Sequence, residues 1–587
     1  GNEAGDGPTF VKGYKWIKFY DPTRIVMYER TSVHPEFKEQ KLGYYLEPHT
    51  DFLSWMYDTV EELKKTYIGK FPDRPFIWSE YSHSMGNSTG NLSENWDFIR
   101  TERQMQGGFI WDFLDQGLAA IDKDGTKYWK FGGDFAPNHY HTDGNFCLNG
   151  IVNADRTPHP ALEEVKHVYQ NAHASWADEK KKEILLYNEN FFTSLAAYKL
   201  EFVLLKNGVE IESYTQNLQT LPQETAYIPL TFKSELENSS DYHVNIYGKL
   251  KKADALLAEG HLAFSEQLLL QEGEIETSNG VQNGKIEVVK NQNEIHFSIG
   301  ELSLGFNKSS GYLTTLDVSG SEMLLKSTKP HYWRAPIDND YGNKMHTRLK
   351  AWKEASENQK LISFSHKKTK QGHLLESVFE LAAVNSKAVM SYLIQPNGSV
   401  RVTHSFDYGG AHDKTEMPRV GLNMQLSSSL ENVEWYGRGP HENYIDRKAS
   451  AFMGSYSAKV NEMKFDYGRP QENGYRTQTK QLSITDQNGV GLQFMGLPEF
   501  SFAVHNNTTD DYDDGAWKNS KRKDALGNPK NSHLNDIKPR DLLNLNIDYR
   551  QMGVGGDNSW GAKPHDQYLI WPKDYTYSFI IQPIIIE

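Results

Sequence analysis

The chain of 587 residues has a single cysteine, Cys147, and little positive charge. One cysteine excludes an internal disulfide and a zinc site built on cysteines, but it leaves the compartment open, because many secreted proteins also lack disulfides. No apolar run reaches the ~18 residues that span a bilayer, so we expect no membrane partner. Because 63 Lys and Arg face 77 Asp and Glu, the net charge is −14. Nucleic acid is therefore not expected as a partner, since its binding depends on basic side chains that neutralise phosphates.

The first seven residues, GNEAGDG, contain neither the basic nor the apolar segment of a signal peptide. We therefore expect further sequence upstream of Gly1 and a soluble protein, either cytoplasmic or periplasmic.

Aromatic side chains are abundant: 13 Trp, 32 Tyr and 28 Phe. Their rings stack well on the C–H faces of sugars, but they also fill ordinary β cores. The length exceeds what one hydrophobic core can organise and indicates roughly three to four domains. Composition thus predicts a multidomain protein and leaves the role of the aromatic residues open.

Residues 1–171 alternate predicted helices with short apolar strands. One helix begins at Pro8, and the capping-box pattern Thr59-x-x-Glu62 begins another. Buried strands are predicted at residues 25–28, 75–78 and 107–111, and further helices at about 92–99 and 161–170. This alternation is typical of a parallel α/β layout, and four such units would form the C-terminal half of a (β/α)8 TIM barrel. Half a barrel has open edges that other structure must cover.

From residue 172 onward the hydrophobic period becomes strand-like. Asn207-Gly208 between two apolar runs predicts a hairpin. Residues 172–267 have the length of an immunoglobulin-like β-sandwich, and residues 279–587 are patterned as one large β-sandwich. The stretch from Phe264 to Gly273 is interpreted as the start of a connection between the two, with the linker assigned to residues 268–278.

Two glutamates follow apparent strands in the α/β part. Glu80 comes after an apolar strand and just before His83, while Glu3 lies at an apparent junction of strand and helix. The active site of a parallel barrel lies at the C-terminal ends of its strands. A single glutamate there is usually a salt-bridged strand-end carboxylate. A pair facing each other about 5 to 5.5 Å apart would suit retaining glycoside hydrolysis, with one nucleophile and one acid/base.

Motifs along nearly the whole chain form one collinear pattern. They are GNE (1–3), WSEYSHSMGN (78–87), QGGFIWDFLDQ (106–116), NG (149–150), DRTPHP (155–160), RAPIDND (334–340), GPHENY (439–444) and GGDNSW (555–560). Together they closely resemble the bacterial β-galactosidases of glycoside hydrolase family 2. The resemblance implies a partial TIM barrel followed by an immunoglobulin-like β-sandwich and a large β-sandwich, or supersandwich, of the β-galactosidase small-chain type.

The resemblance also implies roles in catalysis. Glu80 matches the nucleophile that forms a galactosyl-enzyme, and Glu3 matches the general acid/base. Tyr57 matches the tyrosine that hydrogen-bonds the nucleophile and helps its departure. Two departures from the family pattern border these residues: Ser79 replaces the usual cysteine before the nucleophile, and Ser54-Trp55 replaces Cys-Pro before the tyrosine.

Substrate contacts are implied by the same resemblance. Asn2 matches the contact to the sugar 2-hydroxyl, His83 a ligand of a sugar hydroxyl, and Trp111 the floor of the galactose site. Structural alternatives for these three are a helix-cap asparagine, a satisfied core histidine and a barrel-core tryptophan. Trp560, from the far β-domain, matches the tryptophan that stacks on the aglycone, so the C-terminal sandwich is expected to complete the cleft.

The resemblance implies two metal ions, Mg2+ and Na+. Glu3 matches a magnesium ligand, and the Asn149 side chain and Phe146 carbonyl match sodium ligands. Asn149 thereby also contributes to the sugar site. The other magnesium ligands lie upstream in the family, so the Mg2+ site is expected to be incomplete in this chain.

The function implied is that of a retaining β-galactosidase, which hydrolyses terminal, non-reducing, lactose-like β-D-galactosides through a covalent galactosyl-enzyme. One alternative is another family 2 β-glycosidase, a β-glucuronidase or β-mannosidase. The other is a noncatalytic complementation or carbohydrate-binding piece that needs a separate N-terminal chain. Expected partners are a β-galactoside, the absent N-terminal domains in cis or as another chain, and further copies in a homo-oligomer.

Overall fold

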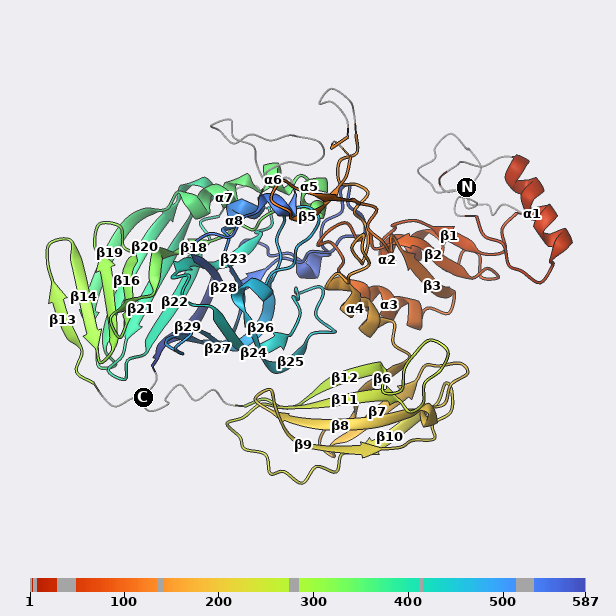
Figure 1. Ribbon diagram of the computed structural model, residues 1–587, viewed down its shortest axis with the longest axis horizontal. Coiled ribbons are helices and arrows are strands. Elements are labelled where there is room, and N and C mark those ends of the chain that lie inside the picture. The colour runs from red at the N-terminus through yellow and green to blue at the C-terminus, as the bar shows by residue number, and fades with distance from the viewer. Residues whose placement is uncertain are drawn as a thin grey trace.

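The computed structural model describes residue 3 and residues 8–28, 49–132, 134–135, 142–273, 284–410, 415–513 and 533–585. Figure 1 shows three regions. An α/β region holds α1 to α4, a small sandwich holds β6 to β12, and a larger assembly holds β13 to β29. The larger assembly contacts both of the others through hydrogen bonds, for example Tyr444 with Asn87 and Met453 with Gln267.

The α/β region is built on a parallel sheet in the order β1-β2-β3. Its elements are α1 (Pro8–Tyr20), β1 (Leu53–Trp55), α2 (Val60–Thr66), β2 (Phe76–Tyr81), α3 (Leu92–Thr101), β3 (Met105–Ile110), the hairpin of β4 (Leu118–Ile121) and β5 (Lys127–Lys130), and α4 (Ala161–Val168). Parallel neighbours need a crossover, which the helices between the strands provide. The C-terminal ends of β1, β2 and β3 therefore share one edge of the sheet.

Local sequence determines where these elements begin. The predicted capping box is confirmed: the Glu62 N–H donates to Thr59 Oγ1 at 3.2 Å, and the Glu62 carboxylate accepts from the Thr59 N–H at 2.8 Å. Apolar side chains of α2, α3 and α4 pack on the sheet, where Leu63, Phe76 and Trp78 are buried in one core.

The strand predicted at residues 25–28 is wrong. These residues follow α1 as coil, and Ile25 is 71% exposed. The Val26 N–H donates to the Asp51 carboxylate at 2.7 Å, and the Val26 carbonyl accepts from the Asp51 N–H at 2.8 Å. Asp51 thus pairs with both the N–H and the carbonyl of Val26, which a neighbouring strand would otherwise pair.

The small sandwich has two antiparallel sheets, β10-β7-β6 and β12-β11-β8-β9. Its strands are β6 (Ala172–Asp178), β7 (Glu183–Asn188), β8 (Tyr198–Lys206), β9 (Val209–Gln216), β10 (Thr225–Pro229), β11 (Tyr242–Leu250) and β12 (Leu262–Gln271). The predicted hairpin at residues 207–208 is confirmed. Asn207 and Gly208 have φ of 49° and 80°, the positive values that a type I′ turn requires at both central residues.

The prediction of a connection that starts at Phe264 is wrong for residues 264–271. Residues 262–271 form β12, which pairs along β11, and Phe264 is buried in the core of the small sandwich. Its apolar side chains therefore contribute to a sheet rather than to a connection. Residues 274–278 of the expected linker lie outside the described residues.

The larger assembly is predominantly antiparallel β-structure. One sheet of five strands contains β13 (Glu287–Lys290), β14 (Glu294–Ile299), β15 (Leu302–Asn307), β16 (Leu313–Val318) and β17 (Ser321–Glu322). A sheet of twelve contains β18 (Leu324–His331), β19 (Lys360–Lys368), β20 (His373–Leu381), β21 (Ser386–Ile394), β22 (Val400–Asp407), β23 (Arg419–Leu426), β24 (Asn432–Gly439), β25 (Phe452–Lys459), β26 (Arg476–Thr485), β27 (Gly491–His505), β28 (Leu543–Gln551) and β29 (Tyr575–Ile584). The short helices α5 (Asp338–Gly342), α6 (Met345–Arg348), α7 (Lys350–Glu357) and α8 (Thr509–Tyr512) lie together along one edge (Figure 1). One continuous core joins both sheets.

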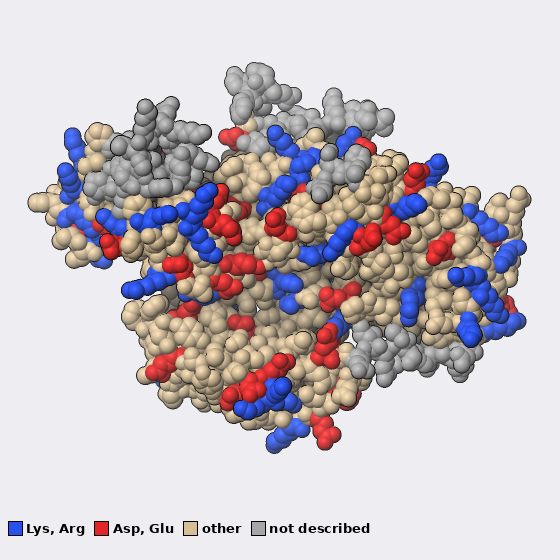
Figure 2. Space-filling view, turned by 180° about the vertical axis from the view of Figure 1, so that it is seen from behind, with Lys and Arg blue, Asp and Glu red and all other residues tan. Residues whose placement is uncertain are grey.

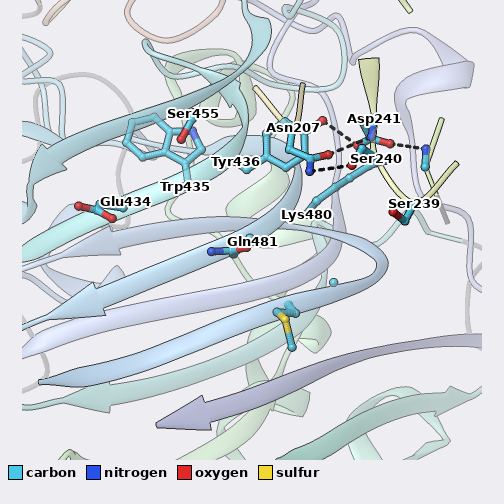
Figure 3. Close-up of a pocket in the computed structure, with 13 residues that line it drawn as sticks. Asn207, Ser239, Ser240, Asp241, Glu434, Trp435, Tyr436, Ser455, Lys480 and Gln481 are labelled. Carbon is cyan, nitrogen blue, oxygen red and sulfur yellow. Dashed lines mark hydrogen bonds and ion pairs between the residues drawn. The ribbon is translucent and has the colours of Figure 1, made fainter. Parts of the chain in front are cut away.

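The small sandwich docks on the larger assembly through its β8–β9 turn. The Ser455 N–H donates to the Gly208 carbonyl at 3.1 Å, and a Cβ at Gly208 would lie 2.5 Å from the Ser455 nitrogen. Beside the turn, Asp241 accepts from the Tyr436 hydroxyl and pairs with Lys480, both at 2.7 Å, at the rim of a cavity of about 470 Å³ (Figure 3). Although burial opposes it, these two contacts hold the pKa of Asp241 below its usual range.

Surface charge is mixed. On the face that Figure 2 shows, Lys and Arg side chains are interspersed with Asp and Glu over the described residues. This distribution differs from the continuous basic stripe that phosphate backbones select. Among the described helices, none combines the length and the apolar character needed to cross a bilayer.

Candidate functional site

Tyr57 and Glu80 are joined twice where β1 and β2 end. The Tyr57 hydroxyl donates to Glu80 Oε2 at 2.5 Å, and the Tyr57 N–H donates to the Glu80 carbonyl at 2.8 Å. The two residues meet because β1 and β2 are parallel neighbours, so their C-terminal ends lie at the same edge. Tyr57 has a φ of 57°, which turns the chain back over the strand ends. Glu80, the predicted nucleophile, and its predicted tyrosine partner are thus in direct contact.

The Tyr57 hydroxyl is held in its protonated form. Burial, the hydrogen bond to Glu80 and the charge of Glu80 raise the pKa of Tyr57 well above its usual range, and the charges of Glu3 and Asp112 add to the effect. The phenol donates to the Glu80 carboxylate, and donation to the charged form favours an ionised Glu80. Glu3 is exposed, and its charge still contributes to the raised pKa of Tyr57.

Three aromatic rings from separate segments gather around this pair. The Trp560 ring meets the Tyr57 ring edge-on at 4.8 Å and the His83 ring at 5.3 Å, and Phe146 stacks on His83 at 5.2 Å between ring centroids. Trp560 remains 46% exposed, so part of it is accessible to solvent. An accessible indole next to the Tyr57 ring is suited to stacking on a sugar ring.

His83 is a buried, neutral imidazole. Burial lowers the pKa of His83 to about 3, so the ring carries no charge near neutral pH. Its Nδ1 shares a hydrogen bond of 2.6 Å with the Ser559 hydroxyl, from the residue just before Trp560. This bond fixes the ring and leaves Nε2 to exchange a hydrogen bond with a ligand.

Trp111 and Asn149 lie on loops that meet the loop of His83. The Ser84 N–H donates to the Trp111 carbonyl at 2.8 Å, and the Asp112 N–H donates to the Asn149 carbonyl at 2.9 Å. Trp111 is half-buried at the end of β3, and Asn149 is buried. The structure therefore brings the loops that follow β2 and β3 into contact with the segment at residues 146–149.

The predicted site residues converge, with one exception. The described positions are Glu3, Tyr57, Glu80, His83, Trp111, Phe146, Asn149 and Trp560, and Asn2 lies outside the described residues. Sequence reasoning missed Ser559 and Asp112 as neighbours of the site. Each directly adjoins a motif tryptophan, which is the signal that points to them.

The metal predictions differ in how well the described residues fit them. Within the described ranges no group of three or more His, Cys, Asp and Glu side chains could hold a metal ion, so no such set that includes Glu3 is found there for Mg2+. The sodium prediction fits better. Asn149 Nδ2 donates to the Phe146 carbonyl at 2.9 Å, while the buried Asn149 Oδ1 has no hydrogen-bond partner among the described residues. An unsatisfied amide oxygen and a carbonyl oxygen from neighbouring residues of one segment are the kind of hard donors that such a cation prefers.

Three family descriptions match successive parts of the chain. Residues 1–174 match the TIM-barrel domain of glycosyl hydrolases family 2, residues 184–271 match domain 4 of beta-galactosidase, and residues 298–581 match the beta-galactosidase small chain. The predicted fold class, a partial TIM barrel followed by β-sandwich domains, is thereby confirmed.

Curated relatives match along the whole chain. A beta-galactosidase of Priestia megaterium is 32% identical over 591 residues, which cover 100% of this chain and 54% of the relative. A beta-galactosidase of Halalkalibacterium halodurans is 31% identical over 574 residues, which cover 97% of this chain and 54% of the relative. The chain therefore spans about half the length of the curated relatives it matches.

Likeness to solved structures is weak. A galactose 1-epimerase from Lactobacillus acidophilus is 8% identical, with a TM-score of 0.28, over 51% of this chain and 98% of its own. An FMN-binding beta-glucuronidase from Facaelibacterium prausnitzii is 14% identical, with a TM-score of 0.21, over 46% of this chain and 39% of its own. Scores this low carry no structural argument.

Proposed function

Since the chain belongs to glycosyl hydrolase family 2, we propose that it supplies the nucleophile, the acid/base and the aglycone contact of a retaining β-galactosidase. The observation that carries this proposal is the contact of Tyr57 with Glu80 at 2.5 Å, with the charge of Glu3 acting on the same phenol. Two carboxyl groups, one as nucleophile and one as acid/base, are what double displacement needs, and the Tyr57 hydroxyl adds a donor to the nucleophile.

In the first step, the Glu80 carboxylate attacks the anomeric carbon while the bond to the aglycone oxygen breaks. Glu3 transfers its proton to that oxygen, and galactose remains as an ester on Glu80. In the second step, water attacks the anomeric carbon and gives a proton to Glu3, and the bond to Glu80 breaks. Two inversions at one carbon preserve the β configuration.

Tyr57 contributes to both steps through one hydrogen bond. Its donation to Oε2 orients the Glu80 carboxylate before attack, and the same donation stabilises the carboxylate that leaves in the second step. Because the phenol stays protonated far into the alkaline range, this donor is retained over the whole working range of pH.

Substrate binding divides between the regions. We assign the galactose unit to His83, Trp111, Asn149 and the undescribed Asn2, and the aglycone to Trp560. His83 suits a hydroxyl because its ring is neutral and fixed by Ser559, so Nε2 can accept or donate one hydrogen bond. A terminal β-D-galactoside such as lactose would place its second sugar against the exposed indole.

Cations enter the proposal through oxygen donors. The Asn149 Oδ1 and the Phe146 carbonyl would hold Na+ when it is bound, where it would bind a sugar hydroxyl and fix its position. For Mg2+ we assign only Glu3 in this chain, and the remaining ligands would come from elsewhere in the protein.

The proposed partners are an N-terminal portion and further copies of the chain. Three aromatic side chains of α1, Trp16, Phe19 and Tyr20, are between 64% and 81% exposed. Exposed apolar side chains in such a group favour contact with another surface. The longer curated relatives support a covering N-terminal portion, in cis or as a separate chain. Homo-oligomer formation rests on family resemblance alone.

Trapping the intermediate tests the proposal. An aryl 2-deoxy-2-fluoro-β-galactoside with a good leaving group should inactivate the protein as its gene encodes it, with one fluorogalactosyl group bound per active site. Digestion and mass spectrometry should place that group on Glu80, and the α-anomer should leave the protein unlabelled. A label on any other residue would contradict the nucleophile assignment.

A further inference from the structure

The loop between β2 and α3, residues 82–91, is buried along its whole length. Connecting loops usually lie at the surface, because their backbone groups need partners. This loop begins two residues after Glu80 and carries His83. Its first half is bound within the α/β region: the Ser84 N–H donates to the Trp111 carbonyl at 2.8 Å, and the Gly86 N–H donates to the Leu148 carbonyl at 3.3 Å.

The second half of the loop is bound by the larger assembly, mainly through Asn87. The Asn87 N–H donates to Gln471 Oε1 at 3.0 Å. Its Nδ2 donates to the Tyr444 hydroxyl at 3.0 Å and to the Glu472 carbonyl at 2.8 Å. Its Oδ1 accepts from Arg447 Nη2 at 2.6 Å. The whole side chain of Asn87 is therefore satisfied by residues more than 350 positions away.

Arg447 holds this half of the loop at two points. While Nη2 donates to Asn87, Nη1 donates to the Thr89 carbonyl at 3.1 Å. The guanidinium is 2% exposed and pairs with the buried Glu442 at 2.9 Å. Glu442 is itself fixed by the Tyr467 hydroxyl and the Gly474 N–H, each at 2.6 Å. Because a guanidinium is planar and rigid, its two nitrogens fix the spacing and the orientation of both loop contacts together.

Stability alone accounts poorly for this arrangement. A buried ion pair gains little net stability, because the loss of hydration offsets the attraction between the charges. Precise geometry at a catalytic site is worth more, since a displacement of about 1 Å can cost about 100-fold in rate. The Arg447 contacts lie four and six residues beyond His83, on the same buried segment that follows Glu80.

We propose that Arg447 is a positioning residue that, through Asn87 and Thr89, fixes loop 82–91 and so sets Glu80 and His83 against Trp560. This rests on the proposed function, because the value of the geometry is that these residues act on one sugar. Arg447 itself touches no reacting atom.

A matched control exists in the same assembly. Arg419 is also fully buried and pairs with Glu472 at 3.2 Å and Asp548 at 3.4 Å. Its side-chain hydrogen bonds to described residues remain within the larger assembly, to Gln551, Glu472 and His331. Arg419 binds the Glu472 carboxylate, whereas Asn87 binds the Glu472 backbone carbonyl, so removing Arg419 disturbs a buried charge and deletes no direct hydrogen bond to loop 82–91.

The experiment compares Arg447→Met, Arg447→Lys and Arg419→Met in the protein as its gene encodes it. For an aryl β-galactoside, Arg447→Met should lower kcat about 100-fold, with a smaller change in KM, and should speed hydrogen exchange in the peptide that contains residues 82–91. Arg447→Lys keeps the charge but cannot bridge Asn87 and Thr89, so it should recover thermal stability without recovering kcat. Arg419→Met should leave exchange in that peptide unchanged.

Recovery of kcat by Arg447→Lys would overturn the proposal, as would unchanged exchange in loop 82–91. An equal rise in exchange in Arg419→Met would do the same. Should Arg447→Met not fold, Asn87→Ala decides, because it removes the loop's side of the contact and should give the same loss of kcat and the same faster exchange. If the wild-type protein hydrolyses no galactoside, the proposed function fails separately, and the exchange measurements still decide whether Arg447 fixes the loop.

Discussion

Ser559 and His83 are separated by 476 residues in the chain, yet the Ser559 hydroxyl lies 2.6 Å from His83 Nδ1. One residue belongs to the larger assembly and the other to the loop after the strand of Glu80. Trp560, directly after Ser559, then contacts Tyr57 and His83 with its ring. The site is thus shared between regions that the sequence places at opposite ends.

Replacing Trp560 with alanine should weaken the aglycone contact. Loss of ring stacking should raise the apparent dissociation constant of glucose as a transglycosylation acceptor about three- to tenfold. Hydrolysis, with water as the acceptor, should change little. Acceptor titration with product analysis measures both. Trp571→Ala removes an indole of similar exposure from the same assembly and should have no effect. An unchanged acceptor constant in Trp560→Ala would remove its aglycone role.

Tyr57→Phe should lower kcat for an aryl β-galactoside about 100- to 1,000-fold, because it deletes one donor to the nucleophile. Both steps use this donor, so substrates with good leaving groups should be slowed as well. Steady-state kinetics with a series of leaving groups measures the effect. Tyr20→Phe, at an exposed position of α1, is the matched control. A kcat within twofold of the wild-type value would exclude the role assigned to Tyr57.

Buried histidines should make the protein less stable in mild acid. Burial lowers the pKa of His404 to about 3, below the usual 6.5, so the unfolded chain binds a proton that the folded chain does not. The stability that this group contributes is present above pH 6.5 and is lost as the pH falls towards 3, at up to about 1.4 kcal/mol per pH unit. Urea unfolding, monitored by hydrogen exchange in β22, measures the free energy of unfolding. The excess of the wild-type value over that of His404→Gln should therefore be smaller at pH 5 than at pH 7. A constant difference between the two proteins would refute this account.

Asn149 should mediate a response to sodium. Replacing Na+ by tetramethylammonium at constant ionic strength should raise KM for a galactoside severalfold, since the Asn149 Oδ1 and Phe146 carbonyl would lose their cation. Asn149→Ala should show the higher KM in both salts. Asn145→Ala alters the same segment by removing a hydrogen bond of 2.8 Å to Asp338, and it should keep the sodium response. A sodium response that persists in Asn149→Ala would exclude this site.

Local signals predicted local structure well. The capping box of Thr59 and Glu62 and the turn at Asn207-Gly208 are confirmed, because each depends on residues next to one another. Motif resemblance predicted the family, which the family descriptions and the relatives bear out. The strand at residues 25–28 was wrong because strand formation needs a neighbour, and Asp51 takes that neighbour's hydrogen bonds. The start of the linker was wrong because β11 pairs with residues that carried no distinct signal of their own.

For the candidate site too, the sequence indicated contacts between neighbouring strands but not contacts between distant regions. The motifs indicated Tyr57 and Glu80, and their contact follows from two adjacent parallel strands. The contacts of Ser559 with His83 and of Arg447 with Asn87 depend on how whole regions pack, and no periodicity or spacing in one segment reports that. The roles assigned to the individual site residues remain predictions.

The burial of loop 82–91 has a consequence for biosynthesis. Arg447 lies 358 and 360 residues after the loop atoms that it binds. At a translation rate of about 5 to 20 residues per second, roughly 20 to 70 s separate synthesis of the loop from synthesis of its partner. During that interval the loop lacks the partners that Arg447 supplies, and its backbone and amide groups are hydrogen-bonded to water instead. Messages truncated before the codon for Arg447 would yield chains in which this segment never acquires its partners, and quality-control proteases should remove them.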